Sequence, residues 1–408
     1  MYTLSIYIIG FLLKIIALFN KKIRLFVNGR KNVFDFLKKN IRKNENYVWV
    51  HTASLGEFEQ GLPVIQSLKA RGEKIIVTFF SPSGYEVKKN SPDADIITYL
   101  PLDTPENARK FIETVNPSMA IFVKYEFWIH YLEELKRRQI KTFLLSGIFR
   151  ENQIFFKWYG KLMRDCLHSF THFFVQNERS EKLLQSIGFE NITVSGDTRF
   201  DRVSEILKRD NSLSFIEEFK GDSLCVVFGS SWESDEAIYL QYINYLEEKN
   251  VKFIIAPHNV KPEQVDTFCR KISRKTVFFS DKEGKNLADY EVFILDTIGI
   301  LTKVYSYADI AYVGGGMGNS GLHNVLEPAV FGIPVIIGKN YEKFSEAVSL
   351  VEKGGVISVS DANQFEKTMT ILVADAYKRK KMGTINAEFI AENCGATQKF
   401  LHKAINSD

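Results

Sequence analysis

The chain has 408 residues, a formal net charge of +4 and four cysteines. This length is too great for one ordinary core and predicts two domains of roughly 200 residues each. The cysteines form no C-x-x-C pair and no metal-ligand spacing, which favours a reducing compartment and argues against a structural zinc site.

The first 45 residues are apolar and then basic. Leu4–Phe19 is apolar apart from Ser5, Gly10 and Lys14, and residues 1–45 hold ten Lys or Arg against two acidic residues, a balance of +8 that leaves −4 elsewhere. The run is shorter than the roughly 20 residues of a spanning helix, and no signal-peptide cleavage site follows it. We therefore expect an uncleaved membrane anchor at 1–45, interfacial or marginally spanning, whose basic part contacts anionic headgroups and keeps the next domain on the cytoplasmic side.

Two other interpretations of residues 1–45 were weighed. In the first, the apolar run is a soluble helix that packs on the rest of the protein, in place of a membrane anchor. Nucleic-acid binding is disfavoured because the basic cluster adjoins an apolar helix and the rest of the chain is acidic.

Beyond residue 45, apolar strands alternate with helix-length segments, as in parallel doubly wound sheets. Two series of strands are predicted on either side of the polar stretch Ser204–Asp222. They are Tyr47–His51, Lys74–Phe79, Ala94–Tyr99, Met119–Val123, Lys141–Ser146, His172–Val175 and Ile192–Val194, then Ser223–Phe228, Lys252–Ala256, Thr276–Phe279, Glu291–Leu295, Ile310–Val313 and Pro334–Ile337. This α/β pattern predicts Rossmann-like domains at 46–208 and 222–408 that face a cleft, with ligands beyond the carboxyl ends of the strands.

Charged residues follow two strands of the first series. Glu57 comes after Gly56, which allows close approach of a ligand, so its carboxylate could act as a base; alternatively, it is a charge that favours a helix N-terminus. Lys124 and Glu126 flank Tyr125 after another strand, and strand alternation would put both charges on one side. They could position a substrate or form a surface salt bridge.

Other charged residues of the first domain give weaker evidence of a functional role. Arg199 and Arg202 could hold an anionic substrate by bidentate contacts, or belong to a charged loop. Asp93-Ala94-Asp95 is expected to be a loop, because it precedes a strand and lies far from the glycine cluster described next. No metal site is predicted.

The stretch Val313–Gly338 is the most informative one. Three glycines, Gly314–Gly316, follow an apolar strand, and a short helix is predicted after them, with Pro328 in its first turn and Gly332 at its end. Unpaired N–H groups at such a helix start favour an anion, and Glu327 could accept hydrogen bonds from two ribose hydroxyls. The combination indicates a nucleotide site; a tight packing turn is the alternative.

Polar residues also follow strands of the second series. Ser230 and Ser231, after Gly229, would offer hydroxyl and backbone donors to phosphate. His258 could face the nucleotide, or be a hydrogen-bonded cap or core residue.

The order of these motifs resembles the Kdo transferases, nucleotide-sugar glycosyltransferases of GT-B fold that build the inner core of lipopolysaccharide. The motifs are VWVHTASLGEFEQ (48–60), KYEFW (124–128), SGDTRFDRV (195–203), FGSSWESDE (228–236), APH (256–258), DTIGIL (296–301) and VGGGMGNSGLHNVLEPAVFGIPVIIG (313–338). The sequence departs from the family's pattern at Ser231 and Trp232, where Thr and His are often found. In GT-B chains the C-terminal helix, here from about Asn363, crosses back to the first domain.

The resemblance implies an inverting transferase that moves Kdo from CMP-Kdo to a lipid A precursor at the cytoplasmic face of the inner membrane, without metal or cofactor. It implies Glu57 as the catalytic residue and Ser54, Gly56, Lys124, Glu126 and Arg199 as residues that position the acceptor or sugar. The implied donor-binding residues are Gly229, Ser230, Ser231, His258, Gly299, Gly314, Gly315, Gly316, Asn319, His323, Asn324 and Glu327. A GT-B enzyme with a UDP-sugar donor and a non-catalytic nucleotide-binding membrane module are the alternatives.

Overall fold

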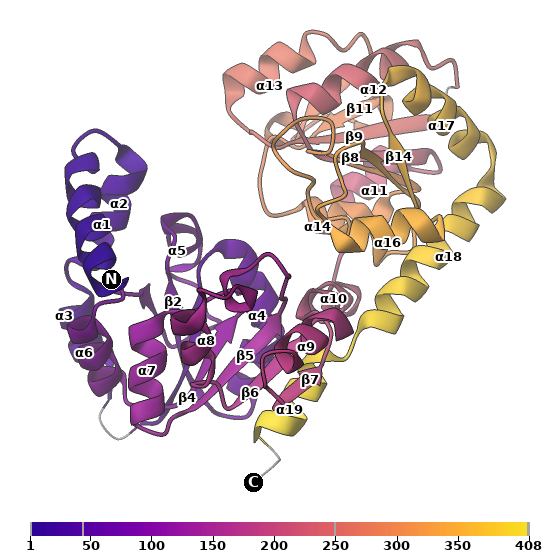
Figure 1. Ribbon diagram of the computed structural model, residues 1–408. Coiled ribbons are helices and arrows are strands. Elements are labelled where there is room, and N and C mark those ends of the chain that lie inside the picture. The colour runs from indigo at the N-terminus through magenta and orange to yellow at the C-terminus, as the bar shows by residue number, and fades with distance from the viewer. Residues whose placement is uncertain (1, 43–44, 249, 406–408) are drawn as a thin grey trace. The chain divides into compact units, whose positions relative to one another are not determined.

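The computed structural model describes residues 2–42, 45–248 and 250–405. Lys43, one of the ten basic residues counted at the N-terminal end, and Asn44 lie outside the described residues. The chain divides into two compact units, one of Met1–Arg202 with Asn393–Asp408 and one of Val203–Glu392. Each unit is built on a seven-stranded parallel sheet flanked by helices (Figure 1).

The sheet of the first unit has the order β3-β2-β1-β4-β5-β6-β7. Its strands are β1 (Tyr47–Thr52), β2 (Lys74–Phe79), β3 (Ile96–Tyr99), β4 (Pro117–Val123), β5 (Lys141–Gly147), β6 (His172–Val175) and β7 (Ile192–Val194). The side chains of β1 alternate between two cores, with Trp49 in one and Val48 and Val50 in the other. The strand order reverses between β1 and β4, and such a reversal is where open α/β sheets generally bind ligands.

Helices cover both faces of this sheet. They are α1 (Tyr2–Ile16), α2 (Lys21–Arg30), α3 (Val33–Asn40), α4 (Leu55–Ala70), α5 (Pro82–Lys88), α6 (Pro105–Val115), α7 (Ile129–Arg137), α8 (Lys161–Leu167), α9 (Glu178–Gln185) and α19 (Ala396–Ile405), with a 3-10 turn η1 (Ile154–Phe156) and, at the junction with the second unit, α10 (Thr198–Ser204).

The second unit has the sheet order β10-β11-β9-β8-β12-β13-β14, which reverses between β8 and β12. Its strands are β8 (Leu224–Ser231), β9 (Val251–Pro257), β10 (Thr276–Phe278), β11 (Val292–Ile294), β12 (Ile310–Val313), β13 (Val335–Gly338) and β14 (Val356–Val359). Its α-helices are α11 (Ser214–Lys220), α12 (Glu233–Tyr245), α13 (Pro262–Cys269), α14 (Leu301–Val304), α15 (Leu326–Ala329), α16 (Ser345–Lys353), α17 (Ala362–Ala374) and α18 (Ala376–Asn393). Four 3-10 turns complete it: η2 (Glu205–Lys208), η3 (Phe279–Asp281), η4 (Leu287–Asp289) and η5 (Tyr305–Tyr307).

The α/β class and both parallel sheets are confirmed, and each predicted strand is present with small shifts at its ends. The prediction missed β14, whose four residues follow two glycines. It also left out α11, which lies in the polar stretch before the second sheet and buries Ile216 and Phe219. The single helix expected from about Asn363 is three helices, and the last of them, α19, belongs to the first unit.

Within the segment expected to be an anchor, α3 packs into the first unit. Val33 and Leu37 of α3 are buried in a core of the first unit, because the helix turns its apolar side onto α6 and β3. By contrast, α1 leaves Leu4 63% and Phe11 64% exposed. A search of the described helices finds none with the length and apolar character needed to cross a membrane.

Candidate functional site

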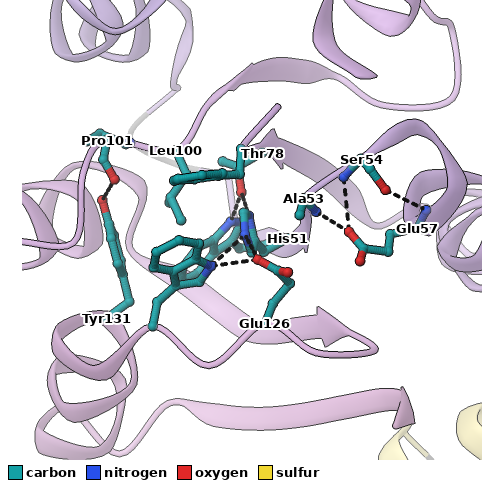
Figure 2. A network of polar contacts seen from close by, with 12 residues as sticks. His51, Ala53, Ser54, Glu57, Thr78, Leu100, Pro101, Glu126 and Tyr131 are labelled. Atoms are coloured by element: carbon teal, nitrogen blue, oxygen red, sulfur yellow. Dashed lines mark hydrogen bonds and ion pairs between the residues drawn. The ribbon is translucent and has the colours of Figure 1, made fainter. Parts of the chain in front are cut away.

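Glu57 lies just beyond β1, in the first turn of α4. Its Oε2 accepts hydrogen bonds from the backbone N–H groups of Ala53 (2.6 Å) and Ser54 (3.0 Å), and Ser54 Oγ accepts one from Glu57 N–H at 3.4 Å (Figure 2). This reciprocal pair is a capping box, which stabilises the start of the helix. Glu57 therefore caps the start of α4, and this cap uses only one of its two carboxylate oxygens. No described residue donates to Oε1, which leaves that oxygen for chemistry.

A buried network lies beside Glu57 and joins β1 to the segment after β4. His51 Nε2 lies 3.0 Å from Glu126 Oε2, and His51 Nδ1 lies 2.8 Å from Thr78 Oγ1 (Figure 2). Glu126 Oε2 also accepts from Trp128 Nε1 at 2.8 Å. Trp128 Nε1 also lies 3.0 Å from His51 Nε2. The network therefore fixes the position of the Glu126 carboxyl group between His51 and Trp128.

Burial raises the pKa of Glu57, and the negative charge of Glu126 raises it further. The N–H groups of Ala53 and Ser54 and the nearby His51 oppose this shift without cancelling it. A carboxylate with a raised pKa is a better proton acceptor at neutral pH than an ordinary surface glutamate. The arrangement suits general-base chemistry.

The expectation that Lys124 and Glu126 point the same way was wrong. β4 ends at Val123, and Lys124 has a φ of 70°, so strand alternation does not extend past the end of the strand. Glu126 turns inward to His51, whereas Lys124 Nζ lies 5.2 Å from the centroid of the Tyr125 ring.

Other predicted residues of the first unit have definite partners. Arg199 pairs with Asp197 at 2.8 Å and Arg202 with Glu59 at 2.9 Å, so both guanidinium groups already contact a carboxylate. Gly56 is open, since an added Cβ would meet only Ser54 Oγ at 4.0 Å. Asp93 accepts from Ser91 and Gln66, and Asp95 from Lys74 and the backbone of Ile75, in agreement with the predicted loop.

In the second unit, the backbone of Gly314–Gly316 lies in close contact with neighbouring backbone atoms. A Cβ on Gly314 would lie 2.4 Å from the carbonyl oxygen of Ser230, and one on Gly316 would lie 2.9 Å from the backbone nitrogen of Gly338. The buried carboxylate of Asp235 accepts from Gly315 N–H at 2.8 Å, and Gly314 N–H donates to Gly229. These two N–H groups are therefore not available to phosphate, and the packing-turn alternative explains them.

Three rings meet beside this loop. The indole of Trp232 stacks on His258 at 4.1 Å and donates from Nε1 to His323 Nε2 at 3.1 Å. The two imidazoles lie 4.7 Å apart, and burial lowers the pKa of each, so both are neutral at pH 7. Ser231, in contrast, is buried, and its hydroxyl accepts from Tyr239, so the hydroxyl of Ser231 is a core group rather than a surface donor.

Glu327 is held in place by two donors. Thr302 Oγ1 donates to Glu327 Oε2 at 2.9 Å, and Asn324 Nδ2 donates to Oε1 at 3.2 Å. Pro328 lies in the first turn of α15, as predicted. Gly299 has a φ of 94° and open space around it, and Asn319 is exposed. Such a preoriented carboxylate can accept from a pair of vicinal hydroxyls.

Six residues that organise these sites were not among the predicted site residues: His51, Thr78, Trp128, Trp232, Asp235 and Thr302. Asp235 had a local signal, because it is the third residue of α12 and its carboxylate accepts from Trp232 N–H, the pattern of a helix cap. The two threonines had none, since their contacts cross between elements distant in sequence. Among the described residues, no group of three or more His, Cys, Asp or Glu side chains is placed to hold a metal ion.

Comparison with solved structures identifies the fold class. UDP-GlcNAc 2-epimerase from Neisseria meningitidis bound to UDP-GlcNAc superimposes with a TM-score of 0.63 at 15% identity, over 88% of this chain and all of that one. MurG from Acinetobacter baumannii does so with a TM-score of 0.58 at 11% identity, over 89% of this chain and all of that one. The protein therefore has the two-sheet GT-B-like fold.

Sequence comparison adds a similarity to one family of enzymes. Residues 28–202 match the family model of 3-deoxy-D-manno-octulosonic-acid transferase (kdotransferase). The 3-deoxy-D-manno-octulosonic acid transferase of Haemophilus influenzae is 28% identical over 87% of this chain and 85% of its own length. The transferase of that name from Aquifex aeolicus is 29% identical over 78% and 84%. Over these ranges the chain is similar to this family of glycosyltransferases, the Kdo transferases.

Proposed function

We propose that the protein is an inverting glycosyltransferase that moves Kdo from CMP-Kdo to a lipid A precursor. The observation that carries the proposal is the carboxylate of Glu57, which lies where the strand order reverses and has a raised pKa. One of its oxygens accepts from none of the residues that the structure describes. Similarity to the Kdo transferases supports the identity of the donor.

The chemistry assigns Glu57 the role of general base. The acceptor hydroxyl oxygen attacks the anomeric carbon of Kdo while the bond from that carbon to the CMP phosphate oxygen breaks. The hydroxyl proton passes to Glu57, and CMP leaves with the electron pair of the broken bond. One displacement inverts the anomeric configuration. His51 and Trp128 act indirectly, because they hold Glu126 and so set the charge beside the base.

The second unit would bind the nucleotide. Glu327, held by Thr302 and Asn324, is assigned to the ribose hydroxyls. The rings of Trp232, His258 and His323 are assigned to the base or the phosphate, because they offer a stacking face and N–H donors beside the glycine loop. No step requires a metal ion or a cofactor.

The proposed location is the cytoplasmic face of the inner membrane. The exposed apolar side chains of α1, such as Leu4 and Phe11, are suited to the headgroup boundary of a bilayer. Basic residues after this helix would add about 1 kcal/mol each near an anionic surface. The full chain should co-sediment with anionic vesicles and much less with neutral ones; equal binding to both would contradict the electrostatic part of this proposal.

The direct test is to incubate the purified full chain with CMP-Kdo and lipid IVA and to read the product masses. We expect lipid IVA to gain the mass of one or more Kdo residues, with CMP released. Transfer from a UDP-sugar instead would favour the other kind of GT-B enzyme. Binding of CMP without any transfer would favour the non-catalytic module.

A further inference from the structure

The side chain of Trp232 contacts two histidines that come from different loops of the second unit. Its indole ring stacks on His258 at 4.1 Å with an interplanar angle of 20°, and its Nε1 donates to His323 Nε2 at 3.1 Å. The backbone N–H of His258 donates to the carbonyl oxygen of Ser231, and that of His323 to the carbonyl oxygen of Gly314. Both histidines are therefore held in place by the backbone as well as by the indole.

The hydrogen bond from Trp232 decides which nitrogen of His323 carries a proton. An indole nitrogen can only donate, so His323 Nε2 accepts and has no proton of its own. A neutral imidazole then carries its single proton on Nδ1. Burial lowers the pKa of His323, the neighbouring His258 lowers it further and Asp235 opposes the shift, so the ring is neutral at pH 7.

The Nδ1–H group of His323 has no acceptor among the residues that the structure describes, although its side chain is half-buried. The ring lies beside the glycine loop, since a Cβ on Gly315 would meet His323 Cδ2 at 3.1 Å. The N–H groups of Gly314 and Gly315 already donate within the protein. A partly buried donor at this place is completed by water or by a ligand that offers an oxygen.

We infer that Trp232 is a positioning residue that presents the Nδ1–H of His323, as a neutral donor, to the phosphate of the nucleotide. The inference rests on the proposed function and deepens its donor site. A proton on Nε2 would point at the N–H of the indole, so Trp232 also disfavours the charged form of His323.

The direction of this hydrogen bond cannot reverse, because an indole has no acceptor nitrogen. Histidine, which often stands at position 232 in the pattern of the Kdo transferases, can donate or accept and would leave the tautomer of His323 open. The fixed tautomer is therefore a consequence of the tryptophan in this chain.

The first test reads the ring nitrogens of His323 by NMR in the full chain with nitrogen-15 histidine, because the two neutral tautomers differ in their nitrogen chemical shifts. His323→Gln identifies the signal among the seven histidines. Trp232→Phe keeps an aromatic ring beside His258 but removes the N–H. Trp158→Phe is the matched control, since it makes the same exchange at a 90% exposed indole of the first unit. Melting temperature checks the fold of each variant.

We expect the Nδ1–H tautomer of His323 in the parent and in Trp158→Phe, and a shift of the Nδ1 signal when CMP is added. In Trp232→Phe, Nε2 loses its donor, so the Nε2–H tautomer should appear and the ring should take up a second proton at higher pH. An Nε2–H tautomer in the parent, or unchanged signals in folded Trp232→Phe, would overturn the inference. The parent signals decide it even if Trp232→Phe does not fold.

A second test measures CMP binding by calorimetry at pH 6 and at pH 8. Because a charged His323 would bind phosphate more tightly, the ratio of the affinity at pH 6 to that at pH 8 should rise about fivefold in Trp232→Phe, the usual difference between charged and neutral hydrogen bonds. The ratio in the parent accounts for the titration of the phosphate itself, and Trp158→Phe should match it.

The two kinds of failure are distinguishable. Binding of CMP that leaves the Nδ1 signal of His323 unchanged would overturn the inference while the proposed function stands. Absence of CMP binding by the folded parent would instead contradict the donor of the proposed function.

Discussion

At the scale of single residues, the most informative side chain is Glu57, because its two oxygens have different roles. Oε2 accepts from Ala53 and Ser54 and so completes the cap of α4, which fixes the direction of the carboxylate. Oε1 remains for an acceptor hydroxyl. The two explanations weighed for this residue, a helix cap and a general base, are thus compatible in one geometry.

Glu57→Gln tests the base without removing the cap, since a glutamine can still accept at Oε1 in a capping box. We expect turnover to fall by about 10²–10⁴-fold, the usual contribution of a general base. Melting temperature and CMP affinity should stay close to those of the parent. Single-turnover rates and calorimetry measure these quantities.

Glu59→Gln is the control for Glu57→Gln, because Glu59 lies two residues along the same helix and pairs with Lys88 and Arg202. We expect it to keep its rate. A Glu57→Gln rate above a tenth of the parent's would return Glu57 to a purely structural role.

Glu126→Gln tests the electrostatic coupling between the two carboxylates. The negative charge of Glu126 raises the pKa of Glu57, so its removal favours the ionised form of Glu57 at lower pH. Because the base must be ionised to work, the acidic limb of the kcat/KM profile should move to lower pH in the variant. A shift to higher pH, or the same shift in the exposed control Glu133→Gln, would contradict this coupling.

Glu327→Ala tests the ribose contact of the nucleotide. Loss of a charged acceptor should weaken CMP binding by about 1.5–3 kcal/mol, whereas Thr302→Val, which removes one hydrogen bond to Glu327, should cost about 0.5–1.5 kcal/mol. Isothermal calorimetry with CMP and UMP measures both effects. Undiminished CMP binding would remove Glu327 from the donor site, and equal binding of UMP would count against a cytidine donor.

At the scale of elements, the alternation of apolar strands and amphipathic helices was enough to predict the sheets, because most strands are short and largely apolar. The loop at Gly314–Gly316 was predicted, but the carboxylate that accepts its hydrogen bond was not. The carboxylate of Asp235 that occupies Gly315 N–H comes from α12, and no local pattern links these two positions. Likewise, Glu126 was predicted near the site, whereas its inward turn to His51 depends on the positive φ of Lys124.

Long-range contacts were also missed at the N-terminal end. Composition there indicated a separable anchor, but α3 is part of the core. Leu37→Ala should lower the free energy of unfolding by about 2–5 kcal/mol, as expected for a fully buried leucine. Leu4→Ala, at an exposed position of α1, should change it by less than about 0.5 kcal/mol. Urea denaturation measures both.

A chain that starts near Asn44 lacks Val33, Leu37 and the hydrogen bond from Arg30 Nε to the carbonyl oxygen of Leu100, and we expect its first unit to lose cooperative unfolding. A stable truncated chain, or equal effects of the two leucine substitutions, would favour the separable segment after all.

At the scale of the whole molecule, the phosphate charge would be met by side chains rather than by a metal ion. The described residues contain no cluster of three potential ligands, whereas His258 and His323 place ring nitrogens beside the glycine loop. We therefore expect transfer of Kdo to proceed at an unchanged rate in excess EDTA. Loss of activity in EDTA that added magnesium restores would contradict this expectation. As a control, a zinc enzyme assayed in the same buffer should lose its activity, which shows that the chelator is effective.

The return of α19 to the first unit has a consequence for how the chain is made. Phe400, Leu401 and Ala404 belong to the same core as Val48 and Phe143, and Asp201 accepts hydrogen bonds from the N–H groups of Gly395 and Thr397. A ribosome therefore releases the whole second unit before it supplies the helix that covers this face of the first. During that interval the first unit exposes apolar surface, and nascent chains halted between the two units should depend on chaperones until α19 emerges.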